Sequence, residues 1–154
     1  MCRSIQMYDR ILVPTDGSEA AAIATEEAVE LAELNDAELH VLYVIEPIPL
    51  GKFAAGAEPA SAEWDDVVDE QRTEGEDATA SVAALADDHD VDVVEAIEHG
   101  QPNEQILGYA DEHGIDAIVM GTHGRSGAGR LVVGSVTEKV VRKSDVPVLT
   151  IRKS

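Results

Sequence analysis

Short apolar runs alternate along the chain with longer amphipathic stretches. The short runs are typical of buried strands, and the longer stretches repeat apolar positions every three to four residues, as helices do. The pattern predicts strands at residues 10–14, 39–45, 91–97, 115–120 and 146–151. Helices are predicted at residues 19–34, 62–88, 102–113 and 135–143. The segment 47–62 contains prolines and glycines and is predicted to be a flexible loop.

The alternation of strands and helices predicts a single α/β domain over residues 1–154 with a core at about 8–152. Its sheet is expected to be open, parallel and Rossmann-like, with helices on both faces. The first, second and fourth strands are almost continuously apolar, as central strands are. The third strand carries Asp92 and Glu95 and the fifth carries Pro147, which suits sheet edges. The strand order that satisfies these constraints most simply is 3-2-1-4-5.

The composition narrows the class of protein. Asp and Glu number 31 against 11 Lys and Arg, and a net charge of −20 argues against a nucleic-acid or membrane-surface binder. The single cysteine, Cys2, excludes an intrachain disulfide. With no apolar run of about 20 residues and no signal-peptide core, we expect a soluble cytoplasmic protein. The dispersed carboxylates favour a halophilic source, and the alternative is a merely acidic protein.

The segment after the fourth strand is the main candidate for chemistry. In the order 3-2-1-4-5 the chain reverses direction between strands one and four, where open α/β sheets bind ligands. Residues 121–134 face that point, are rich in glycine and lead into a helix at Ser135. Residues 121–143 also carry a net charge of +4. These features indicate an anion site at a helix N-terminus, or else a plain connecting loop with Ser135 as a cap.

The spacing Gly-x2-Gly-x9-Gly-Ser, formed by Gly121, Gly124, Gly134 and Ser135, resembles the signature of the ATP-binding universal stress proteins. Ile-Leu-Val-Pro-Thr-Asp-Gly-Ser at 11–18, residues 118–125 and Val-Pro-Val-Leu at 146–149 are similar to the same family. The resemblance extends from about residue 8 to 152. It implies the sheet order above, ATP at the switch point, and a homodimer paired through strand 146–151.

The resemblance also implies a set of contact residues. Those that match adenine and ribose contacts are Pro14, Thr15, Asp16 and Val44. Those that match contacts on the other half of the site and on the phosphates are Met120, Gly121, Gly124, Gly134, Ser135, Val136 and Thr137. His123 and Arg125 lie in the same segment, where His123 either touches the ligand or stabilises the turn.

Asp16 has two readings from the sequence. Its carboxylate can accept a ribose hydroxyl or help to hold Mg²⁺ at the phosphates. The alternative is a helix cap, a role for which Ser18 competes.

Three functions fit these observations. The first is a stress-response sensor or signalling dimer that depends on nucleotide occupancy, and the second is a slow ATPase or an autophosphorylating phosphotransfer enzyme. The third, an interaction protein without a ligand, is disfavoured by the intact glycine spacing. No evident base or nucleophile stands beside the expected phosphates, which favours little or no turnover.

Overall fold

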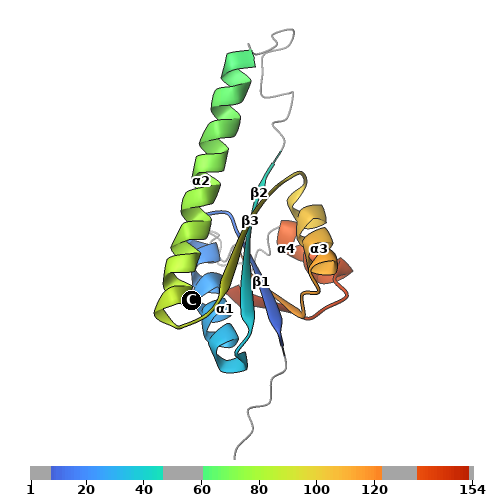
Figure 1. Ribbon diagram of the computed structural model, residues 1–154. Coiled ribbons are helices and arrows are strands. Elements are labelled where there is room, and N and C mark those ends of the chain that lie inside the picture. Colours follow the sequence, from blue (N-terminus) through green and yellow to red (C-terminus); the bar gives the residue numbers. More distant parts are fainter. Residues whose placement is uncertain (1–7, 47–60, 123–134, 153–154) are drawn as a thin grey trace, which may run out of the picture.

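The computed structural model describes residues 8–46, 61–122 and 135–152 (Figure 1). Within these ranges the elements are β1 (Arg10–Thr15), α1 (Glu19–Asn35), β2 (Glu38–Ile45), α2 (Ser61–Asp88), β3 (Val93–His99), α3 (Pro102–Glu112), β4 (Ala117–Thr122), α4 (Ser135–Lys143) and β5 (Val148–Arg152). All pairings are parallel and the order is β3-β2-β1-β4-β5, which confirms the predicted sheet. The predicted loop lies outside the described residues until Ser61, where α2 begins.

The sheet is covered on both faces. Helices α1 and α2 lie on one side of it and α3 and α4 on the other (Figure 1). Successive residues of a strand point to opposite faces, so each strand contributes to two cores. Ile11 and Val13 of β1 belong to the core under α1 and α2, while Leu12 belongs to the core under α3 and α4.

Strands β3, β4 and β5 each begin two residues later than the apolar pattern predicts. Val91 and Ile115, which the pattern assigns to strands, donate their amide hydrogens to carbonyl oxygens in the last turns of α2 and α3. Each follows a residue in the left-handed region, Asp90 (φ 57°) or Gly114 (φ 62°). This is the helix-ending geometry in which an apolar residue packs back on the last turn. The two apolar residues therefore close helices rather than open strands.

Helix α2 runs without interruption through Gly75, a residue that weakens a helix in isolation. A Cβ atom at Gly75 would lie 2.7 Å from Cδ1 of Tyr43 on β2. The glycine therefore lets the helix cross the tyrosine ring closely. The N-terminal part of α2 projects beyond the end of the sheet (Figure 1).

Candidate functional site

A cavity of about 250 Å³ lies at the carboxyl ends of β1, β2 and β4, where the sheet reverses direction. The first turns of α1, α3 and α4 complete its walls. The predicted residues that line it are Pro14, Thr15, Asp16, Val44, Met120, Gly121, Val136 and Thr137. His123, Gly124, Arg125 and Gly134 lie outside the described residues. Ser135 is the first residue of α4, as predicted.

The inner end of the cavity is apolar. Leu42, Ile106 and Met120 are all buried there, and they belong to the core under α3 and α4. Leu42 and Ile106 are not among the residues predicted from the sequence. Leu42 carried a signal, because it lies two residues before Val44 and so points to the same face of β2. Ile106 carried none, because helical periodicity does not show which turn of a helix faces a cavity.

The turn after β1 settles which residue caps α1. The Oγ of Ser18 accepts a hydrogen bond from the Ala21 amide at 3.2 Å, so Ser18 is the cap. Oδ1 of Asp16 accepts from the Ser18 amide at 2.9 Å, and Gly17 between them adopts φ 79°. The Asp16 carboxylate is therefore held on the rim of the cavity by the turn rather than used as the cap.

Gly121 brings three elements together at the end of β4. A Cβ atom there would lie 2.4 Å from the carbonyl oxygen of Ala20, in the first turn of α1. On the other side, the hydroxyl of the buried Thr137 donates to the Gly121 carbonyl at 3.2 Å. The glycine was predicted to let a phosphate approach. The structure shows that it is also required for packing, since α1 could not lie this close to any larger residue.

The described rim of the cavity is negatively charged. Asp16 and Glu46 both line it, and no Lys or Arg of residues 8–46, 61–122 or 136–152 does so. The pKa of the nearby Tyr43 hydroxyl is raised above its ordinary value, first by burial and then by the carboxylates of Glu74, Asp16 and Glu46. An anionic ligand would therefore need countercharge from another source.

The basic residues predicted near the site do not all lie beside the cavity in the structure. Arg142 and Lys143 stand in the last turn of α4, away from the cavity, and Arg142 forms an ion pair with Glu138. Their positive charges interact favourably with the negative, C-terminal end of the helix dipole, so they stabilise the helix rather than the site. Arg125 belongs to the segment outside the described residues.

The acids of the described residues do not form a metal site by themselves. Within the part of the chain that the structure describes, no group of three or more His, Cys, Asp or Glu could hold a metal ion. Mg²⁺ is commonly bound by one or two carboxylates together with substrate phosphates. Asp16 is placed to supply such a carboxylate, and the apolar end of the cavity suits a base.

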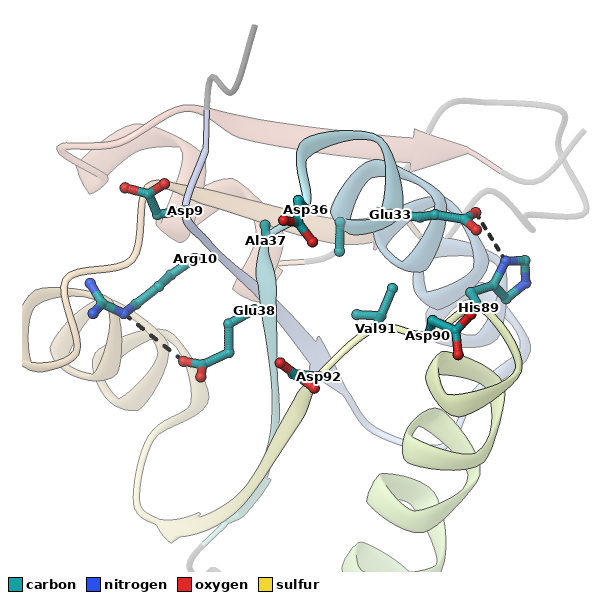
Figure 2. Close-up of a pocket in the computed structure, with 11 residues that line it drawn as sticks. Asp9, Arg10, Glu33, Asp36, Ala37, Glu38, His89, Asp90, Val91 and Asp92 are labelled. Carbon is teal, nitrogen blue, oxygen red and sulfur yellow. Dashed lines mark hydrogen bonds and ion pairs between the residues drawn. The ribbon is translucent and has the colours of Figure 1, made fainter. Parts of the chain in front are cut away.

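A second cavity, of about 550 Å³, lies at the opposite, amino ends of the strands (Figure 2). The acids that line it are Asp9, Glu33, Asp36, Glu38, Asp90 and Asp92. His89 contacts Glu33 at 3.1 Å and Arg10 contacts Glu38 at 3.9 Å. Helices α1 and α2 both end here with no basic residue in their last turns. Negative charge is therefore concentrated where the helix dipoles are also negative.

None of the helices within the described ranges is both long and apolar enough to cross a membrane.

Comparison with known proteins gives one consistent result. The model of the universal stress protein family matches residues 7–152. Universal stress protein MJ0531 of Methanocaldococcus jannaschii is 32% identical over 147 residues, covering 96% of this chain and 84% of that protein. The solved structure of MJ0577, from the same organism, is 30% identical with a TM-score of 0.78, covering 96% of this chain and 98% of the other. A universal stress protein solved in complex with cAMP is 26% identical with a TM-score of 0.71, covering 96% and 99%.

Proposed function

The chain belongs to the universal stress protein family, and from this premise we propose that it binds an adenine nucleotide, ATP with Mg²⁺, in the cavity at the carboxyl ends of β1 and β4. The observation that carries the proposal is the convergence on one cavity at the switch point of Pro14, Val44 and Met120, from three strands, and of Asp16, from the turn after β1. The relative in complex with cAMP supports an adenine ligand.

The lining suggests how the ligand lies. The base would rest on the apolar end formed by Leu42, Ile106 and Met120. The ribose would lie beside Asp16, whose carboxylate accepts hydroxyl hydrogen bonds. The phosphates would then extend past Gly121 to the N-terminus of α4, where backbone amides and the helix dipole favour negative charge. Mg²⁺ would offset the rim carboxylates.

The role that we propose is a nucleotide-dependent sensor or signalling dimer in a stress response. Strand β5 is the terminal strand of the described sheet, with Leu149 45% exposed, and such an edge is a template for pairing with a second copy. Nucleotide occupancy would act on α4, which borders both the cavity and β5.

Calorimetric titration with adenosine, AMP, ADP and ATP, each with and without Mg²⁺, tests the proposal. We expect adenosine and AMP to bind without the metal and ATP to require it, because the rim carries Asp16 and Glu46. Asp16→Ala should raise the Kd for adenosine about tenfold to 150-fold relative to the wild type, as removing one hydrogen bond to a charged group does. Wild-type affinity for adenosine in Asp16→Ala would place the ribose elsewhere, and no binding of any ligand to the wild type would refute the proposal.

Turnover distinguishes binding from catalysis. After incubation with ATP labelled at the γ-phosphate, the bound nucleotide should remain intact, and less than one labelled phosphate should be released per chain. Sustained release of labelled phosphate would favour the slow ATPase, and label retained on the denatured chain would favour autophosphorylation.

A further inference from the structure

A histidine lies in the core beneath α3. His40 of β2 is 4% exposed and stands in register with Leu12 of β1 and Val94 of β3, in a row that is otherwise apolar. Both of its ring nitrogens have partners. Nδ1 lies 2.7 Å from the hydroxyl of Tyr109 on α3, and Nε2 lies 2.6 Å from Oε1 of Glu38. A buried polar side chain with every hydrogen-bonding atom engaged fixes the geometry of its neighbours.

The Glu38 partner defines the direction of one of these hydrogen bonds. The Glu38 carboxylate can only accept, so Nε2 of His40 carries the hydrogen and donates it. Nδ1 pairs with the Tyr109 hydroxyl, a group that can both donate and accept a hydrogen bond. Arg10 contacts the same Glu38 oxygen at 3.9 Å. The result is a continuous chain, Tyr109 to His40 to Glu38, which crosses from α3 to the amino end of β2.

The properties of Tyr109 favour a positioning role over a catalytic one. Its side chain is 5% exposed, so a substrate cannot reach the hydroxyl. The pKa of that hydroxyl is raised above its ordinary value, first by burial and then by the carboxylates of Glu38 and Glu98, so it remains a donor. The ring of His113 stacks on Tyr109 with centroids 3.8 Å apart and planes 13° apart, which restricts the tyrosine further.

This chain anchors the helix that forms one wall of the candidate site. Within the described ranges, the contact between Tyr109 and His40 is the side-chain hydrogen bond that ties α3 to the sheet. Ile106, three residues earlier on α3, lines the cavity, as does Pro102 at the start of the helix. With a rise of about 1.5 Å per residue, Ile106 lies about 4.5 Å along the axis from Tyr109. A displacement at Tyr109 is therefore transmitted to the cavity wall by one rigid turn.

We propose that the chain Tyr109–His40–Glu38 sets the position of α3 and thereby the shape of the nucleoside end of the cavity, so that Tyr109 and His40 are positioning residues for nucleotide binding. The inference rests on the proposed function, and it adds residues that do not line the cavity themselves. It predicts a specific pattern of affinities, because Ile106 of α3 belongs to the apolar lining, where the base would rest, while the proposed phosphates lie at the N-terminus of α4.

The test is a double-mutant cycle on ligand affinity. Tyr109→Phe, His40→Leu, the double variant and the control Thr79→Val are titrated with adenosine, AMP and Mg²⁺–ATP. Thr79 is also buried and its hydroxyl also donates one hydrogen bond, to the Glu76 carbonyl on α2, but Thr79 does not line the cavity. Circular dichroism and denaturant unfolding establish that each variant is folded under the conditions of the titration.

We expect Tyr109→Phe to raise the Kd of all three ligands by the same factor, about threefold to tenfold, as loss of one buried hydrogen bond does. His40→Leu should raise it at least as much, and the double variant no further than His40→Leu. Thr79→Val should bind as the wild type does. Unchanged affinities in Tyr109→Phe, a loss confined to ATP, or an additive double variant would overturn the inference.

Two further outcomes keep the inference distinct from the proposed function. If the wild type binds no adenine compound, the proposed function fails and the positioning role falls with it. If Tyr109→Phe does not fold, hydrogen exchange on the wild type decides. Adenosine should slow exchange in α3, and α3 exchange that is unchanged by saturating adenosine would contradict a role for that helix in the site.

Discussion

Substituting Gly121 by alanine tests how closely α1 and β4 approach at the candidate site. The new Cβ would lie 2.4 Å from the Ala20 carbonyl oxygen and 2.7 Å from its carbon. These distances are about 1 Å shorter than an ordinary contact between such atoms. Both obstructing atoms are backbone, so no side-chain rotation relieves the clash, and the first turn of α1 must move away from the sheet.

The expected cost follows from two opposing terms. Overpacking in a well-packed region costs about 1–3 kcal/mol. Replacing glycine at a position that does not require positive φ stabilises by about 0.4–1 kcal/mol through the unfolded chain. We therefore expect Gly121→Ala to lower the free energy of unfolding by about 1–2 kcal/mol, which is about 2–8 °C in Tm for a domain of this size.

The chain offers a matched control for the same substitution. Gly108, within α3, has nothing within 4 Å of the position that a Cβ would occupy. Gly108→Ala should raise the free energy of unfolding by about 0.5–1 kcal/mol, because glycine is a poor residue in a helix. Urea unfolding of the two variants and the wild type measures both signs. If Gly121→Ala were as stable as Gly108→Ala, the close approach of α1 would be refuted.

Three other predictions concern the whole molecule. The Tm should rise markedly between dilute buffer and molar KCl, because salt screens the net charge of −20 and the acidic cavity of Figure 2, and a flat response would contradict this. The wild type should be a dimer in light scattering, and Thr150→Pro should be a folded monomer. The Ile118 amide donates to the Pro147 carbonyl, and because backbone groups alternate in direction along a strand, the amide of Thr150 points to the outer edge of β5. A dimeric Thr150→Pro variant would place the interface elsewhere. The pKa values of Tyr43 and Tyr109 are raised in the folded state, so the folded protein retains protons that the unfolded chain releases above about pH 10. The contribution of these two tyrosines to the free energy of unfolding is therefore intact below that pH and is lost as the pH rises through the folded pKa values. Urea unfolding from pH 8 to 11 should show a shallower alkaline loss in Tyr43→Phe/Tyr109→Phe, and an equally steep loss would refute the assignment.

The sheet order could be predicted because burial and charge differ between central and edge strands. Asp92 and Glu95 indicated that the third strand is an edge strand, and Pro147 indicated the same for the fifth. The structure places β3 and β5 at the two edges of the sheet. The starts of β3 and β4 could not be predicted, because an apolar residue that closes a helix looks the same in sequence as one that opens a strand. Asp90 adopts the left-handed conformation that sequence assigns most readily to glycine.

The candidate site was predicted where it depends on strand ends and turn chemistry. Asp16 was singled out by its position after the first strand and Val44 by the family resemblance, and both line the cavity. That they contact a nucleotide stays a prediction. What could not be predicted depends on contacts between distant parts of the chain. His40 and Tyr109 are 69 residues apart, and neither residue type signals a partner by itself. The packing role of Gly121 likewise depends on where α1 crosses β4.

The most direct test of the nucleotide site is to fill the cavity and measure ATP binding. Val44→Trp places a large side chain at the lining, whereas Val68→Trp makes the same change at an exposed position of α2 that does not line the cavity. Calorimetric titration with Mg²⁺–ATP should show the same Kd for the wild type and Val68→Trp, and a Kd at least about tenfold higher for folded Val44→Trp, a change of about 1.4 kcal/mol. Equal affinities for ATP in all three proteins would show that the nucleotide does not bind in this cavity.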